Sequence, residues 1–330
     1  MQKKLYTLAE VTEFILQGAK LVISADESLL DQLPAGNWIG GTIPYFMTEQ
    51  GGSFSKDKLF VDDLSAYGLE VSFKAYDETD IQTITKSSFE NGFTILILPA
   101  GSKVHESFSL NSMSYKDIFF KPITGYVSGF DLNLLGSATA KTYLGKAQMK
   151  YEDKGVAMHV KLPDDQFAKI EIFNLMEIDE SSDVITFPET GFLQKSCMVN
   201  GKATNLAEYL SNLNYAAGLP LIANCQGALI NRSIEKLDMD NKTVLFYAPV
   251  FSDEVYRLAK PVTNYHEEFQ KRIEIYADEN VIYSVLCVVY YMVGELENKK
   301  LPVSGSFTFG EVGYQLLNQT LVYLTLSNSH

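Results

Sequence analysis

Polar side chains that could contact a ligand are concentrated near the end of the chain. Between residues 305 and 326, apolar segments flank a run of hydroxyl, amide and carboxyl groups: Thr308, Glu311, Tyr314, Gln315, Asn318, Gln319 and Thr320. Polar groups gathered between apolar strands are typical of a pocket in which a few hydrogen bonds orient a small molecule. This region is therefore the first candidate for a binding site.

An isolated arginine supplies a second candidate. Arg257 lies in the mostly apolar segment 246–261. A guanidinium in such surroundings can bind the carboxylate of a ligand through two parallel hydrogen bonds. The alternative is an internal ion pair, with Glu254 or Glu311 as the partner. The sequence leaves both interpretations open.

Patterns that would indicate catalysis or a bound cofactor are weak. The Gly-Lys-Ala runs at 145–147 and 201–203 lack the hydroxyl residue and the upstream glycine of a phosphate-binding loop, and the histidines form no zinc signature. Cys225 ends an apolar strand, so a cysteine-dependent hydrolase with His105 or His266 as the base is one alternative. A buried structural thiol is the other. We expect a protein that is not an enzyme, with no catalytic residues, no metal site and no cofactor.

Composition and charge exclude several classes of partner. The chain has 330 residues, and its 27 Lys and Arg against 41 Asp and Glu give a net charge of −14. Such a charge disfavours binding to nucleic acid or to an anionic membrane. The most apolar run, residues 281–294, is too short to span a bilayer. The N-terminus has no signal-peptide block, and three cysteines at wide spacing do not form a disulfide framework, so we expect a cytoplasmic protein.

Periodicity and turn signals predict a mixed α/β fold, with β-rich mixed sheets flanked by helices. Thr7 and Glu10 form a capping box at the start of the first helix, and Asn200-Gly201 predicts a tight hairpin. We predict helices over 8–17, 26–33, 80–91, 206–213 and 264–277. We predict strands over 20–24, 38–43, 59–62, 69–75, 93–98, 126–132, 156–162, 168–176, 184–187, 192–198, 219–225, 243–250, 281–290, 305–309 and 320–326. The length predicts two domains, residues 1–165 and 166–330.

Several short motifs in the C-terminal half resemble the FIST family of sensory domains. The run Val-Asn-Gly-Lys-Ala at 199–203, with the following helix, is similar to the segment "dG-x-pa...yl" of that family. The run Gly-Ser-Phe-Thr-Phe-Gly-Glu-Val-Gly at 305–313 is similar to "GfyTyGEIG", and Asn-Gln-Thr-Leu-Val at 318–322 is similar to "fhNqTl". The order and the distances of these motifs agree over residues 192–326. In the N-terminal half, Thr42 lies where the family has a glycine and small-hydroxyl turn.

The resemblance implies a two-part α/β module that senses a small ligand such as an amino acid. The chain ends soon after the last motif, so a separate signalling protein is the expected partner. The implied site lies between the two halves: Arg257 would pair with a ligand carboxylate and Glu311 with an ammonium, while neutral hydrogen bonds would come from Thr42, Asn318 and Thr320. A haem-based gas sensor is an alternative, although Leu317 stands where the family would supply an axial histidine. A purely structural or interaction protein is another.

Overall fold

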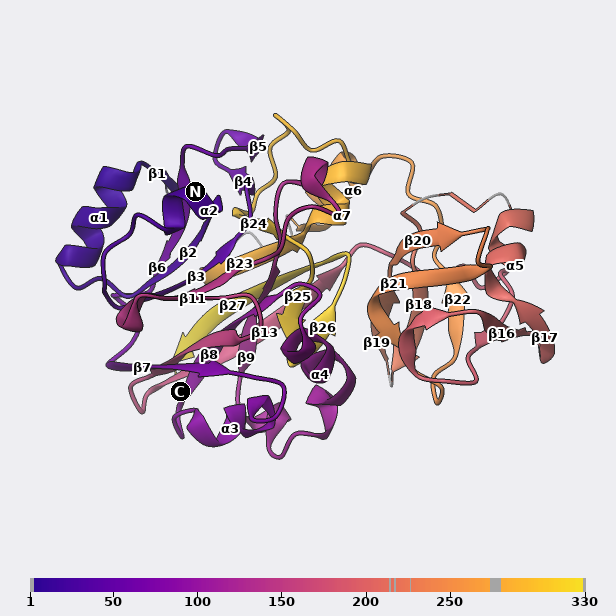
Figure 1. The fold of residues 1–330 in the computed structure, drawn as a ribbon, viewed down its shortest axis with the longest axis horizontal. Helices are drawn as coiled ribbons and strands as arrows, with labels where there is room; N and C mark the ends of the chain where they lie inside the picture. Colours follow the sequence, from indigo (N-terminus) through magenta and orange to yellow (C-terminus); the bar gives the residue numbers. More distant parts are fainter. Residues whose placement is uncertain (1–2, 214, 217, 226, 274–279, 329–330) are drawn as a thin grey trace.

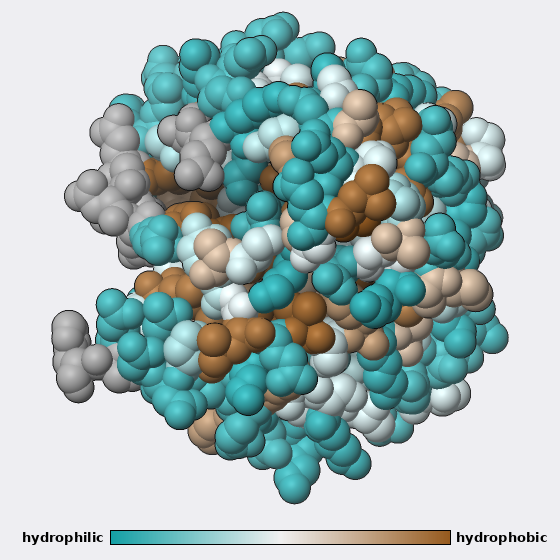
Figure 2. Space-filling model, turned by 90° about the vertical axis from the view of Figure 1, so that its left-hand side faces the viewer, coloured by the Kyte–Doolittle hydropathy of each residue, from teal (hydrophilic) through white to brown (hydrophobic). Residues whose placement is uncertain are grey.

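The computed structural model is a mixed α/β fold with 20% helix and 43% strand, in which several mixed sheets are flanked by helices (Figure 1). It describes residues 3–213, 215–216, 218–225, 227–273 and 280–328. Among these residues, no helix is both long and apolar enough to cross a membrane. Figure 2 shows that the face at the α1 end is mostly hydrophilic, with hydrophobic residues gathered in a few small patches. The predicted fold class is confirmed.

The first sheet is built mainly from the start of the chain. Its strand order is β1 (Leu5–Tyr6), β6 (Leu59–Asp63), β2 (Leu21–Ala25), β3 (Trp38–Thr42), β10 (Thr142–Leu144) and β11 (Met149–Tyr151). Strands β2 and β3 are parallel, with Leu21 opposite Trp38, and the other pairs are antiparallel. Both strands of the parallel pair are buried along their whole length. This pattern agrees with the continuous apolar runs that predicted them.

Two further sheets combine strands from distant parts of the chain. The second has the order β26 (Gln315–Leu317), β25 (Glu311–Gly313), β9 (Ile123–Ser128), β8 (Gly92–Pro99), β12 (Gly155–Lys161) and β7 (Glu70–Tyr76). The third has the order β13 (Gln166–Asn174), β27 (Thr320–Asn328), β23 (Val281–Cys287), β24 (Gly305–Thr308), β4 (Tyr45–Thr48) and β5 (Gly51–Phe54). Strand β25 pairs with β9, and β24 pairs with β4. Both sheets therefore draw strands from either side of residue 165, and the division into domains 1–165 and 166–330 stays a prediction.

Residues 185–258 form a separate set of antiparallel strands, which we call the outer lobe; the three sheets above and their helices are the main body. One lobe sheet has the order β17 (Lys202–Asn205), β16 (Ser196–Val199), β14 (Ile185–Thr186), β22 (Tyr256–Leu258), β18 (Leu221–Cys225) and β19 (Ala228–Arg232). The other has the order β15 (Gly191–Gln194), β21 (Thr243–Val250) and β20 (Ile234–Asp238). With α5 (Leu206–Asn212), they lie at one end of the molecule (Figure 1). The β16–β17 hairpin turns at Asn200 and Gly201, both with positive φ, which confirms its prediction.

Among the described residues, the α-helices of the main body are α1 (Leu8–Leu16), α2 (Glu27–Leu30), α3 (Ile84–Ser87), α4 (Lys103–Asn111), α6 (Tyr265–Ile273) and α7 (Val288–Val293). The capping box of α1 is present, with Thr7 as N-cap, and Asp26 caps α2 as predicted. The predicted helix over 264–277 is confirmed as α6 up to Ile273, and its remaining residues lie outside the described ones.

Sequence patterns gave the wrong element type in two places and missed one helix. The helix expected over 80–91 is a 3₁₀ turn at Ile81–Thr83 followed by α3, because the Ser88 hydroxyl donates to the Ile84 carbonyl and the backbone becomes extended there. The strand expected over 281–290 ends at Cys287, and α7 follows it. Helix α4 was not predicted at all. Its Ser102 N-cap accepts a hydrogen bond from the amide of His105.

Candidate functional site

Glu311 and Thr320 are brought together as predicted, but inside the core. Glu311 starts β25 and Thr320 starts β27. One carboxyl oxygen of Glu311, Oε2, accepts hydrogen bonds from the Thr320 amide at 3.2 Å and from the Thr320 hydroxyl at 2.7 Å. The Glu311 side chain is 0% exposed, and this burial raises its pKa to about 8. Its second oxygen, Oε1, has no hydrogen-bond partner among the described residues.

The turn between β26 and β27 completes this group. Asn318 is 1% exposed and its side-chain amide makes no hydrogen bond within the described structure, whereas its backbone carbonyl accepts from Asn231 of β19 at 3.2 Å. Gln319 has a φ of 48° and its carbonyl accepts from the hydroxyl of Tyr290. We call Glu311, Asn318, Gln319, Thr320 and Asn231 the buried polar cluster. It holds a tight turn and attaches the outer lobe to the main body.

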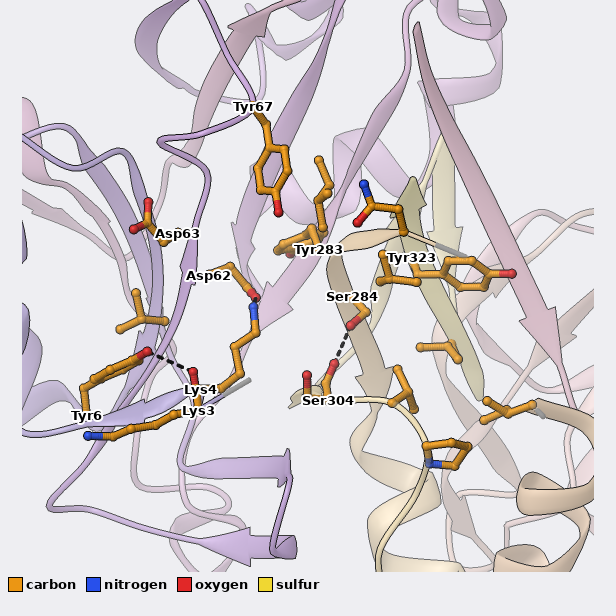
Figure 3. A pocket seen from close by; sticks show the side chains of 18 residues that line it. Lys3, Lys4, Tyr6, Asp62, Asp63, Tyr67, Tyr283, Ser284, Ser304 and Tyr323 are labelled. Carbon is orange, nitrogen blue, oxygen red and sulfur yellow. Dashed lines mark hydrogen bonds and ion pairs between the residues drawn. The ribbon is translucent and has the colours of Figure 1, made fainter. Parts of the chain in front are cut away.

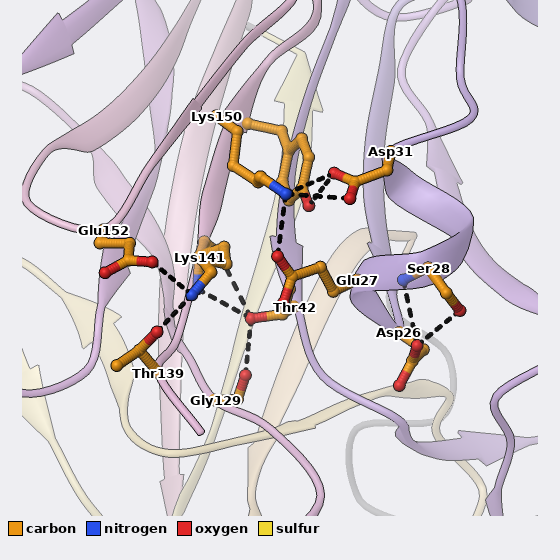
Figure 4. A network of polar contacts seen from close by, with 11 residues as sticks. Asp26, Glu27, Ser28, Asp31, Thr42, Gly129, Thr139, Lys141, Lys150 and Glu152 are labelled. Atoms are coloured by element: carbon orange, nitrogen blue, oxygen red, sulfur yellow. Dashed lines mark hydrogen bonds and ion pairs between the residues drawn. The ribbon is translucent and has the colours of Figure 1, made fainter. Parts of the chain in front are cut away.

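Thr42 lies elsewhere, at the end of β3 (Figure 4). Its hydroxyl donates to the Gly129 carbonyl at 2.6 Å and accepts from the Lys141 amide at 2.9 Å. Backbone hydrogen bonds reinforce both contacts, at 2.7 Å to Gly129 and 3.0 Å to Lys141. The Lys141 ammonium pairs with Glu152 at 2.6 Å. Thr42 therefore joins two loops to the end of a buried strand.

Arg257 and Cys225 both lie in the outer lobe. The Arg257 guanidinium donates to the backbone carbonyls of Glu180 and Ser182, and its Nε lies 3.8 Å from the Glu180 carboxylate. This is an internal contact of the kind left open by the sequence, with Glu180 in place of Glu254 or Glu311. Burial, with a hydrogen bond to Glu254, raises the pKa of the Cys225 thiol to about 11. A nucleophilic cysteine requires the opposite shift.

A cavity of about 600 Å³ lies where the main body meets the outer lobe. We call it the junction cavity. Its apolar lining comes from both parts of the molecule: Val127, Phe130, Leu132, Leu135, Ala138, Ala140, Val288 and Phe309 from the main body, and Phe192, Leu245, Phe246 and Tyr247 from the lobe. A volume of this size suits a small organic molecule. The five residues predicted to bind ligand (Thr42, Arg257, Glu311, Asn318 and Thr320) are absent from this lining.

His105 is a polar group in the wall of this cavity. It belongs to α4 and is 8% exposed. Burial lowers its pKa to about 4, so the imidazole is neutral at pH 7. Nδ1 accepts the Gly101 amide at 3.4 Å, and Nε2 is buried with no hydrogen-bond partner among the described residues. The sequence suggested His105 as a catalytic base or an alternative haem ligand, and no spacing signal linked it to the cavity.

A second cavity, of about 370 Å³, separates β1 and β6 from β23 and β27 (Figure 3). Lys4 and Asp62 form an ion pair of 2.7 Å in its wall. Burial raises the pKa of Asp62 despite this contact. The cavity is smaller than the junction cavity, and its charged groups are already paired within the protein, so it is the weaker candidate.

His159 and His266 have contacts inside the protein. The ring nitrogens of His159 lie 3.0 Å from the Tyr76 hydroxyl and 2.8 Å from the Thr94 hydroxyl. Nε2 of His266 lies 2.9 Å from the Lys300 carbonyl, and His330 is outside the described residues. In the part of the chain that the structure describes, no three His, Cys, Asp or Glu side chains are grouped so that they could hold a metal ion.

The architecture defines a mixed α/β protein with an apolar cavity at the junction of a main body and an outer lobe. The chain belongs to a family of unknown function (DUF6976), whose model matches residues 6–327. No curated protein matches it. The family match spans nearly the whole chain, both the main body and the outer lobe.

Proposed function

We propose that this protein binds a small, largely apolar molecule in the junction cavity and acts as a sensory protein, not as an enzyme. The observation that carries the proposal is the origin of the lining, because main body and lobe both contribute aromatic side chains to one cavity of about 600 Å³. A ligand that fills such a space contacts both parts at once. Its binding would then change how firmly they are held together.

The motifs at 199–203, 305–313 and 318–322 support this proposal through their resemblance to FIST sensory domains. In this chain, the motifs at 305–313 and 318–322 belong to the contact between main body and lobe, since the buried polar cluster extends from β25 and β27 to Asn231 of β19. We propose a separate signalling protein as the recipient of the signal and the cytoplasm as its location. The three free cysteines support that location.

Fluorescence titration with 1-aminoanthracene, an uncharged aromatic probe, tests the binding. We expect saturable binding of one probe per chain. Ala138 lines the cavity from a half-buried position, so Ala138→Trp should fill the space and weaken binding by at least about tenfold. Ala203→Trp, at an exposed position on β17 in the lobe, is the matched control and should bind as the wild type does. Absence of binding to the wild type, or equal binding to Ala138→Trp, would contradict the proposal.

Hydrogen–deuterium exchange tests the sensory part separately. Saturating probe should slow amide exchange in β15, β20 and β21 of the lobe as well as in α4 of the main body. Both sets of residues border the cavity. If the probe slows exchange only in the lobe or only in the main body, the protein binds a ligand but does not couple the two parts, and the sensory role is contradicted.

A further inference from the structure

The tautomer of His105 and its unpaired N–H restrict which ligands suit the junction cavity. Because Nδ1 accepts the Gly101 amide, the single hydrogen of the neutral ring is on Nε2. This N–H is buried and has no acceptor in the described structure. Buried donors are nearly always paired in folded proteins, so an unpaired one in a cavity wall indicates a missing acceptor.

An aromatic ring lies next to His105 at an irregular position of its strand. Phe192 lies on β15 of the lobe, and its ring centroid is 5.9 Å from that of His105. The register of β15 against β21 shifts between Gly191 and Leu193, so Phe192 occupies an irregular position of the strand. Its side chain is only partly buried. Such irregularities commonly redirect a side chain next to a functional site.

The charges of the cavity add a second restriction. Glu106 of α4 and Glu235 of β20 face it from the main body and from the lobe, and its described lining contains no lysine or arginine. Two carboxylates beside an apolar space repel an anion and tolerate a neutral or cationic molecule.

We propose that the junction cavity selects uncharged or cationic aromatic molecules that carry a hydrogen-bond acceptor, with Nε2 of His105 as the donor and Phe192 as the ring that the ligand displaces. This inference rests on the proposed function, because it assigns a ligand class to the same cavity. A carboxylic acid is excluded even though it is a strong acceptor. An aromatic ketone, ether or amide meets all the requirements.

Displacement of 1-aminoanthracene by three naphthalenes of similar size tests the proposal. 2-Acetylnaphthalene has the acceptor, 2-ethylnaphthalene lacks it, and 2-naphthoate carries the excluded charge. His105→Phe keeps a ring in place and removes the donor, while the Gly101 amide lies at an exposed position where water can replace Nδ1. The measured quantity is the ratio of the ketone's affinity to the hydrocarbon's affinity in each protein. When this ratio is compared between the wild type and the variant, the difference in hydrophobicity between the two ligands cancels.

We expect this ratio to be about tenfold higher in the wild type than in His105→Phe. Phe192→Leu should raise it above the wild-type ratio, because a smaller side chain beside His105 leaves the ligand more room to reach Nε2. 2-Naphthoate should bind more weakly than 2-acetylnaphthalene and 2-ethylnaphthalene. The double variant Glu106→Gln and Glu235→Gln should bind 2-naphthoate more tightly than the wild type does. Equal ratios in the wild type and in His105→Phe, or 2-naphthoate as the tightest ligand, would overturn the assignment. If 1-aminoanthracene itself does not bind, the proposed function fails and the assignment fails with it.

Discussion

The buried polar cluster, which the sequence favoured as a ligand site, and the junction cavity, which the structure favours, are built in opposite ways. The cluster is polar and close in sequence, with Glu311, Asn318 and Thr320 within ten residues, and its members contact one another with no solvent access. The cavity is apolar, and its lining comes from segments between residues 100 and 309. Its polar lining includes the unpaired donor of His105 and the carboxylates of Glu106 and Glu235.

This contrast separates two uses of polar residues. In the cluster, Glu311 accepts from the Thr320 amide and Asn231 donates to the carbonyls of Asn318 and Gln319, so these side chains hold the turn and mark a structural requirement. In the cavity, one unpaired donor among apolar side chains leaves both space and a hydrogen bond for another molecule. The predictions below test whether the cluster is structural and whether the cavity alone binds ligand.

The largest effect is expected at Glu311. Glu311→Ala removes the acceptor of both Thr320 hydrogen bonds and leaves a hole in the core, so the free energy of unfolding should fall by about 3–5 kcal/mol. Chemical denaturation at pH 6 measures it. A loss below about 1 kcal/mol would contradict a structural role and would reopen the cluster as a ligand site.

Glu311→Gln is the matched control, and its effect depends on pH. The folded pKa of about 8 lies above the ordinary value of 4.5, so below pH 4.5 both folded and unfolded chains keep the proton. Between about pH 4.5 and 8 the unfolded chain releases the proton and the folded chain retains it, so the wild type loses stability as the pH rises. The glutamine variant escapes this loss. Its stability relative to the wild type should therefore increase over this range by on the order of a few kcal/mol.

A smaller effect is expected at Thr42, outside both regions. Thr42→Val keeps the shape and removes the hydroxyl, so the Gly129 carbonyl and the Lys141 amide each lose one hydrogen bond. The Gly129 amide and the Lys141 carbonyl keep their backbone hydrogen bonds to Thr42, so both loops stay attached and the loss should be about 1–2 kcal/mol. Thermal unfolding measures it, with Thr263→Val at an exposed position as the control. Binding of 1-aminoanthracene should stay within about twofold. A tenfold change would place Thr42 in a ligand site, as the sequence suggested.

Local rules predicted the elements that depend on neighbouring residues. The capping box of α1 and the Asn200-Gly201 turn were found in place, because both are decided by contacts within four residues. The apolar run 281–294 gave no such signal. Its residues are apolar on every side, so periodicity could not show that strand β23 ends at Cys287 and α7 begins.

The candidate site could be predicted only in part, for a similar reason. Glu311, Asn318 and Thr320 come close together because short turns join β25 to β26 and β26 to β27. The polar motif in the sequence indicates this region. The junction cavity requires the packing of α4 against a lobe that begins more than seventy residues later. His105 and Phe192 are far apart in the sequence, so their contact could not be predicted before the fold was known.

The smallest effect is expected at Arg257. It tests the role that the sequence suggested for this residue, binding of a ligand carboxylate. The side chain of Glu180 is 81% exposed and lies 3.8 Å from the guanidinium, so their ion pair contributes little. Arg257→Ala should therefore lower the free energy of unfolding by about 1 kcal/mol or less, through the lost hydrogen bonds to two carbonyls. Affinities for 2-naphthoate and for 2-acetylnaphthalene should not change, because Arg257 does not line the junction cavity. A loss of 2-naphthoate binding in this variant would mean that Arg257 binds a ligand carboxylate after all, at a site distinct from the cavity.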